Sequence, residues 1–132
     1  MKRLLLPLLA AIALPTAVNA ETIYLSCTAN NENKYKFSIT INEANLSSLI
    51  TFPNRDGTTD LIKGNLFATS DAFVIRAAYS PTNSDMYQRF EISRLNGSFF
   101  RYMGSVKYPV KVPETKVLDG ICIKEKKKKT LF

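Results

Sequence analysis

The residue types that most often carry catalysis are sparse in this sequence. It contains no histidine, so neither a Ser-His-Asp or Cys-His system nor a histidine-containing zinc site can form. Its acidic side chains are scattered through turns and alternating positions, and no spacing brings two carboxylates together for acid–base catalysis. The sequence therefore predicts no catalytic residues, no metal site and no cofactor, with an enzyme that uses only carboxylates as an alternative.

Two cysteines, Cys27 and Cys122, lie near the two ends of the chain that follows the apolar start. An even number of cysteines in an exported protein favours a disulfide bond between them. The alternative is two buried thiols. A bond between the two cysteines would close a loop of about 95 residues, which stabilises a fold by on the order of 4–5 kcal/mol in the chain-entropy model.

A basic segment near the end of the chain is the feature with the clearest candidate partner. Its five lysines carry most of the net charge of +7, and the signal-like start adds two charges, so the body between them is nearly neutral. A flexible polycation can contact an anionic membrane surface, each lysine contributing about 1 kcal/mol or less. The alternative is a solvated, disordered end. The lysines are Lys124, Lys126, Lys127, Lys128 and Lys129.

One stretch spaces oxygen-bearing side chains at alternate positions, as a calcium-binding loop does. These are Asn54, Asp56, Thr58 and Asp60. The glycine of the stretch, Gly57, is not at the sixth position that an EF-hand loop requires. We therefore expect a polar β-turn at this point, not a metal site.

The first twenty residues have the pattern of a bacterial signal peptide. Lys2 and Arg3 precede the apolar run Leu4–Leu14, and the small residues Val18 and Ala20 fit a signal peptidase site. The run is shorter than the ~20 residues that a membrane-spanning helix needs. We expect cleavage after Ala20 and export to the periplasm or beyond the cell. The expected organisation is a signal peptide (1–20), a single β domain (21–123) and a disordered basic tail (124–132).

The rest of the chain has the period-two alternation of half-buried β-strands. Ile23–Ala29 and Tyr35–Ile41 alternate apolar and polar residues most cleanly. Short strands at regular spacing with turn residues between them predict an all-β antiparallel fold of about eight strands, either a small barrel or a sandwich. The further expected strands are 46–52, 58–63, 66–69, 72–79, the two arms of a hairpin in 86–103, an edge strand at 106–112 and a short last strand at 121–123, with a polar loop at 80–85.

The hairpin in 86–103 is the densest aromatic stretch of the sequence. Asn96-Gly97 between two apolar runs is a strong turn signal, and a three-residue loop, Leu95–Gly97, places apolar residues on one face. This register would pair Ile92 with Phe100, Phe90 with Tyr102, and Glu91 with Arg101. It also predicts that Phe99, Tyr24 and Tyr87 face outward, where exposed aromatic side chains can form a binding patch.

The hairpin and the chain end resemble a pattern in small exported bacterial β proteins of uncharacterised families. The residues are Phe90-Glu-Ile92-Ser-Arg94-Leu-Asn-Gly97-Ser-Phe99 and Gly120-Ile-Cys122, and the resemblance implies a β domain without a specific activity. Tyr24-Leu-Ser-Cys27 is similar to the first strand of periplasmic inhibitors of C-type lysozyme, although their Ser-Gly-x-x-Tyr loop is absent.

We therefore expect an exported binding or envelope-associated module that is not an enzyme. An anionic membrane surface or an envelope protein is the expected partner. Nucleic acid is not, because the body lacks a basic stripe interleaved with aromatic residues. The alternative function is inhibition of an envelope-acting hydrolase such as a lysozyme.

Overall fold

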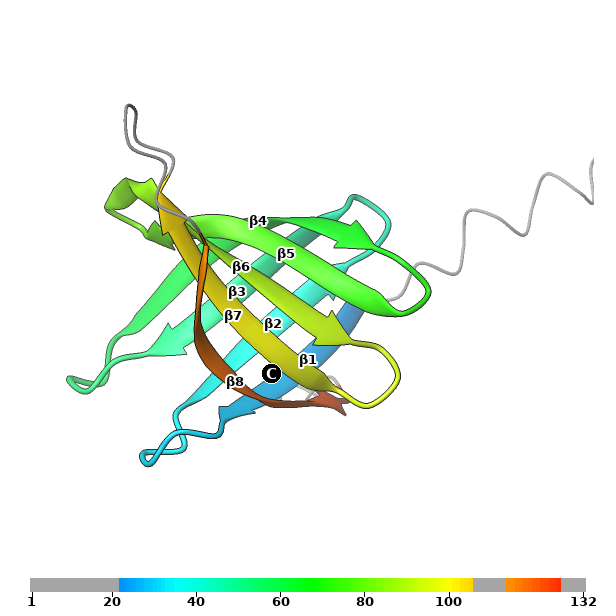
Figure 1. Cartoon of the computed structure of the whole chain (residues 1–132), viewed down its shortest axis with the longest axis horizontal. Coiled ribbons are helices and arrows are strands. Elements are labelled where there is room, and N and C mark those ends of the chain that lie inside the picture. Colours follow the sequence, from blue (N-terminus) through cyan, green and yellow to red (C-terminus); the bar gives the residue numbers. More distant parts are fainter. Residues whose placement is uncertain (1–21, 106–113, 127–132) are drawn as a thin grey trace, which may run out of the picture.

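The computed structural model describes residues 22–105 and 114–126, which form eight antiparallel strands. Each strand pairs with the next, and β1 also pairs with β8, so the sheet closes into a barrel (Figure 1). The barrel form of the predicted all-β fold is thereby confirmed. The strands are β1 (Thr22–Ala29), β2 (Lys36–Asn42), β3 (Ser47–Pro53), β4 (Thr59–Ala68), β5 (Ala72–Ser80), β6 (Asn83–Ser93), β7 (Ser98–Ser105) and β8 (Thr115–Glu125).

The alternation of residue types determines which side of the sheet faces inward. In β2, Phe37, Ile39 and Ile41 are buried, whereas Lys36 and Ser38 are exposed. Successive side chains of a strand point to opposite faces of the sheet. Because an eight-stranded barrel has an interior just wide enough for side chains to fill, the apolar faces of the strands together make the core.

Aromatic rings fill the middle of this core. The centroid of the Phe37 ring lies 5.6 Å from that of Phe52, 5.5 Å from that of Phe90 and 5.3 Å from that of Phe99. Aromatic pairs at such distances contribute roughly 0.5–1.5 kcal/mol each beyond the apolar area they bury. The rings come from β2, β3, β6 and β7, so they hold opposite walls of the barrel together.

The barrel has two ends that carry different connections. The β2–β3, β4–β5 and β6–β7 turns lie at one end, on the right in Figure 1, and we call it the β6–β7 end. The β1–β2, β3–β4 and β5–β6 turns lie at the other, on the left, and we call it the β5–β6 end. The start of β1 and the close of β8 belong to the β6–β7 end, since Tyr24 pairs with Glu125.

The predicted register of the β6–β7 hairpin is wrong. Ile92 is opposite Phe99, not Phe100, and Phe90 is opposite Arg101. The loop has four residues because Ser93 organises it: its Oγ accepts from two backbone amides, those of Leu95 and Asn96 at 3.2 and 3.3 Å. Glu91 is consequently opposite Phe100 and forms an ion pair with Arg89 instead of Arg101.

This register also reverses the expected orientation of Phe99. Its side chain is fully buried in the core, whereas Phe100 is exposed. Arg101 lies on the same inward face as Phe99. The outer aromatic residues are covered by cations: Lys116 Nζ lies 5.1 Å from the Phe100 ring centroid, and the Arg89 guanidinium carbon 4.3 Å from that of Tyr102. Such cation–π contacts stabilise aromatic side chains on the solvent side.

Three strands are longer than predicted. The two short strands expected on either side of Gly64 are one continuous strand, β4. β6 begins at Asn83, inside the expected polar loop 80–85. β8 runs from Thr115 to Glu125, far beyond the expected 121–123, so the first two residues of the predicted basic tail lie in a strand.

Some predictions lie outside the described residues. These are the signal peptide, the edge strand 106–112 and the lysines from Lys127 onward. No helix in the described part of the chain is long and apolar enough to cross a membrane.

Candidate ligand-binding site

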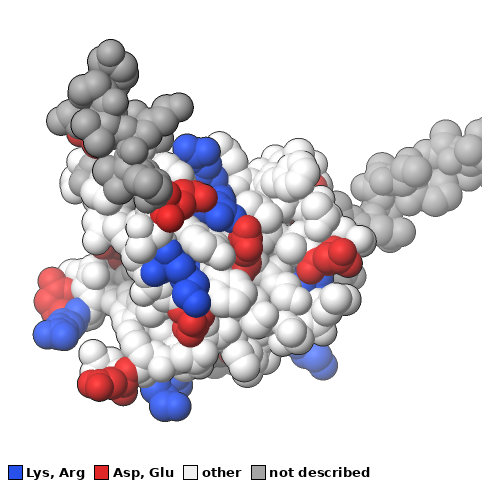
Figure 2. Space-filling model, viewed as in Figure 1, with Lys and Arg blue, Asp and Glu red and all other residues white. Residues whose placement is uncertain are grey.

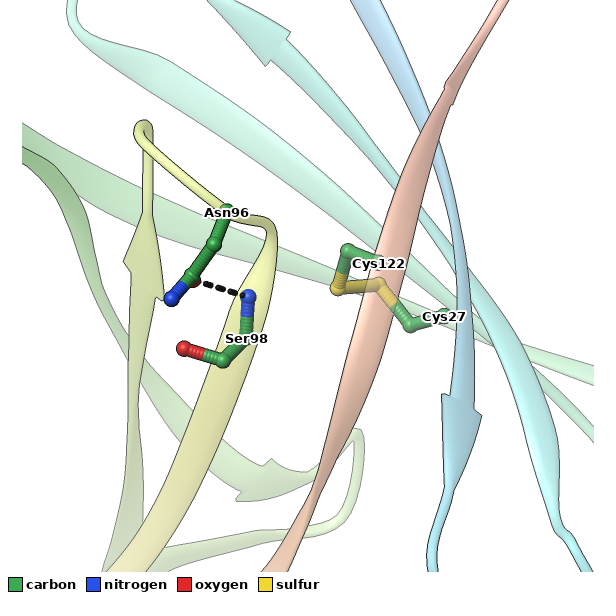
Figure 3. The surroundings of a disulfide bond; sticks show 4 residues. All are labelled: Cys27, Asn96, Ser98 and Cys122. Carbon is green, nitrogen blue, oxygen red and sulfur yellow. Dashed lines mark hydrogen bonds between the residues drawn. A yellow bond between two sulfur atoms is a disulfide. The ribbon is translucent and has the colours of Figure 1, made fainter.

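The two cysteines form a disulfide bond between the first and last strands, as predicted. Cys27 of β1 is directly opposite Cys122 of β8, with their Cα atoms 3.9 Å apart and their sulfur atoms bonded. The bond lies beneath the β6–β7 turn (Figure 3). It therefore fastens the seam at which the barrel closes, and it is compatible with an oxidising compartment.

A groove opens beside this seam at the β6–β7 end. The paired part of β7 starts at Ser98, opposite Ile121 of β8. Beyond this pair, β8 is paired only with β1. A 2.7 Å hydrogen bond from the Cys122 amide to the Gly97 carbonyl holds β8 to the β6–β7 turn. A cavity of about 440 Å³ lies beside the turn and this end of β8.

The groove is apolar in its interior. Leu25, Phe73 and Ile92, all buried on the inward face of the barrel, form its floor. Ile121 and Ile123 of β8 line its outer side and are 51% and 64% exposed. Isoleucine side chains this exposed next to an apolar floor form a patch that is available to a ligand.

Two cations stand at the rim of the groove. Lys124 is opposite Leu25 and alternates with Ile123, so it lies on the barrel-interior side of β8 at its open end. No acid in the described ranges lies within salt-bridge distance of this lysine. Arg94 is held more firmly: its guanidinium carbon lies 4.3 Å from the Phe73 ring centroid, one Nη donates to the Thr69 carbonyl at 2.9 Å, and the other lies 3.5 Å from a carboxylate oxygen of Glu43.

The turn that forms one wall is braced by its own polar groups. Gly97 has a φ of +77° and donates its amide to the Ser93 carbonyl at 3.0 Å. The Asn96 side-chain oxygen accepts from the Ser98 amide at 2.9 Å (Figure 3). The wall of the groove is therefore preorganised, which lowers the entropic cost of binding.

The predicted surface lysines are only partly within the described chain. Lys124 lies at the groove rim and Lys126 is exposed just after β8. Lys127, Lys128 and Lys129 lie outside the described residues. Of the predicted aromatic patch, Tyr24 and Tyr87 lie on the outer face by the alternation of their strands, but Phe99 does not.

The stretch around Gly57 is a β-turn, as expected. Asp56 accepts hydrogen bonds from the amide and the hydroxyl of Thr58 at 2.9 and 2.5 Å, and these bonds lower the pKa of its carboxyl group. The Asn54 side chain donates to the same hydroxyl. In the described ranges no three cysteine or acidic side chains are grouped so that they could hold a metal ion.

An ion-pair cluster covers the outer face of β6 and β7. Arg89 Nε lies 2.9 Å from Glu114, and the same guanidinium also pairs with Glu91. The hydrogen bond from Arg89 lowers the pKa of Glu114. Burial raises the pKa of the Tyr87 hydroxyl, and a hydrogen bond with Glu114 adds to this effect. Figure 2 shows basic and acidic side chains interleaved on this face, so it offers no field of a single sign.

The groove residues other than Lys124 were not predicted from the sequence. Arg94 lies in the β6–β7 turn, Phe73 on β5 and the two isoleucines on β8, and only the closed barrel brings them together. The sequence of β8 did carry one indication of exposed apolar side chains: Ile121 and Ile123 alternate with Cys122 and so lie on the opposite face from this buried cysteine.

No family model matches the sequence of this chain, and neither a curated protein nor a solved structure is significantly similar to it.

Proposed function

We propose that this protein is an exported, envelope-associated binding module and not an enzyme. Its ligand would be an anionic amphiphile, such as a fatty acid or an acidic lipid, whose apolar part occupies the groove at the β6–β7 end. The observation that carries the proposal is an apolar groove with Lys124 and Arg94 at its rim.

The size and lining of the groove support a ligand of this class. Small-molecule sites usually have volumes of about 300–1,000 Å³ with mostly apolar walls and few polar groups, and the groove has about 440 Å³. Each buried methylene group contributes about 0.8 kcal/mol. Lys124 favours an anionic head group by charge complementarity, and Lys126 lies close enough in the chain to add to the same field.

Calorimetric titration of residues 21–132 with laurate and with dodecanol tests this proposal. We expect saturable binding of laurate, weaker binding of dodecanol, and a loss of this difference in Lys124→Gln. Ile123→Asn should lower the affinity for both ligands by about tenfold, because it removes exposed apolar surface at the groove. Phe67→Asn is the matched control, since Phe67 is 67% exposed and lies on β4 outside the groove.

Two outcomes would contradict the proposal. One is equal laurate affinity in Ile123→Asn and Phe67→Asn, which would place any binding elsewhere. The other is no laurate binding together with inhibition of a lysozyme by the protein, which would favour the alternative function of a hydrolase inhibitor.

A further inference from the structure

Arg101 of β7 places a cation inside the barrel. It lies on the inward face with Phe99 and is opposite Phe90. Its guanidinium carbon is 5.5 Å from the ring centroid of Phe52 and 5.7 Å from that of Phe90. Burial lowers the pKa of Arg101. A charge in such surroundings is costly unless an ion of opposite sign and hydrogen bonds compensate it.

A fixed hydrogen-bond chain orients this guanidinium. Arg101 Nε donates to Gln88 Oε1 at 2.9 Å, and Gln88 is fully buried. The amide nitrogen of Gln88 donates in turn to the carbonyls of Ala78 and Tyr79 at 2.9 and 3.2 Å. These carbonyls lie where the β5–β6 register shifts between Ala78 and Ser80. A second shift, between Arg101 and Tyr102, adjoins the arginine itself, and bulges of this kind often aim side chains at binding sites.

The part of the chain that the structure describes places no carboxylate beside this cation. In the ranges that the structure describes, Gln88 is the hydrogen-bond partner of Arg101 and no carboxylate lies within salt-bridge distance of it. The side chains that interact electrostatically with Arg101 are those of Tyr79 and Tyr35, near the β5–β6 end. The carboxylate of Asp60 raises the pKa of Tyr35. The segment 106–113, which connects β7 to β8, contains no acidic residue in its sequence.

We propose that Arg101 forms a second binding site, independent of the groove, for the carboxylate of a small organic acid. The Arg101 side chain is half-buried, so part of it is exposed to solvent. Because Gln88 engages Nε, the remaining N–H groups of the guanidinium can bind both oxygens of a carboxylate. The rings of Phe52 and Phe90 provide an apolar wall for the body of the acid.

Titration of the ¹⁵N-labelled protein with benzoate, benzamide and inorganic phosphate tests this site. We expect benzoate to shift the Arg101 Nε–H and Gln88 amide signals saturably, and benzamide and phosphate to leave them in place. Arg101→Lys should weaken benzoate binding by about tenfold or more, because an ammonium group lacks the two-pronged geometry of a guanidinium. Arg89→Lys, on the outer face, is the matched control and should bind benzoate as the unaltered protein does.

The comparison of the three ligands on the unaltered protein needs no variant, so it remains decisive even if Arg101→Lys does not fold. Equal shifts with benzoate and benzamide would overturn the proposal. So would phosphate shifting these signals where benzoate does not, or an unchanged benzoate affinity in a folded Arg101→Lys variant. None of these results depends on whether laurate binds in the groove.

Discussion

Gly97 connects the β6–β7 turn to β8 at a contact too close for a side chain. It has a φ of +77°, and a Cβ atom added there would lie 2.4 Å from the Cys122 carbonyl oxygen. Gly57 has a similar φ of +88° but open space around it. The two positions therefore separate the cost of backbone conformation from the cost of a clash.

Alanine substitution at the two glycines should give unequal losses of stability. Gly57→Ala should cost about 1 kcal/mol, the effect of a positive φ alone. Gly97→Ala should cost about 3 kcal/mol or more, because the turn or β8 must also move. Urea denaturation measures both values. Equal losses would mean that the turn does not clamp β8.

The carboxyl group of Glu114 predicts a pH effect on stability. Its pKa is lowered in the folded protein by the hydrogen bond from Arg89. The ionised Glu114 carboxylate therefore contributes its full stabilisation of the fold above the ordinary glutamate pKa of about 4.3. This stabilisation is lost as the pH falls through the lower pKa of the folded protein.

Glu114→Gln should accordingly reduce stability at pH 7 and have little effect at pH 3. The expected difference is within about 1 kcal/mol, since the pair is at the surface. Denaturant unfolding of both proteins at the two pH values gives the comparison. A variant equally destabilised at both values would show that packing, not charge, is the source.

At the scale of elements, the strands were predictable because period-two alternation reports directly on which residues face the core. The disulfide was predictable from the cysteine count and the expected export. The hairpin register was not, because the hydrogen bonds that the Leu95 and Asn96 amides donate to Ser93 Oγ set the loop length. The inward position of Arg101 was not either, since Gln88 and the carbonyls that orient it belong to two other strands.

The disulfide should stabilise the seam and, with it, one wall of the groove. Replacing Cys27 and Cys122 by alanine should lower the free energy of unfolding by about 3–5 kcal/mol, because the bond closes a loop of 95 residues. It should also weaken laurate binding, since the end of β8 loses its anchor. Thermal denaturation with and without reductant measures the first effect. An unchanged melting temperature would contradict it.

At the scale of the whole molecule, a closed barrel leaves no free sheet edge, so its two ends are the places where the interior meets the solvent. The β6–β7 end combines an apolar floor with Lys124 at its rim. The groove could not be derived from the sequence, because its lining residues come from separate strands and from the β6–β7 turn.

The position of a bound amphiphile on the barrel tests the groove most directly. Methyl NMR spectra of the labelled protein, recorded with spin-labelled laurate, report each residue that the ligand approaches. We predict broadening of the Leu25, Ile92 and Ile123 signals, and none at Ile62 on the opposite wall. Uniform broadening, or broadening confined to the β5–β6 end, would contradict binding in the groove.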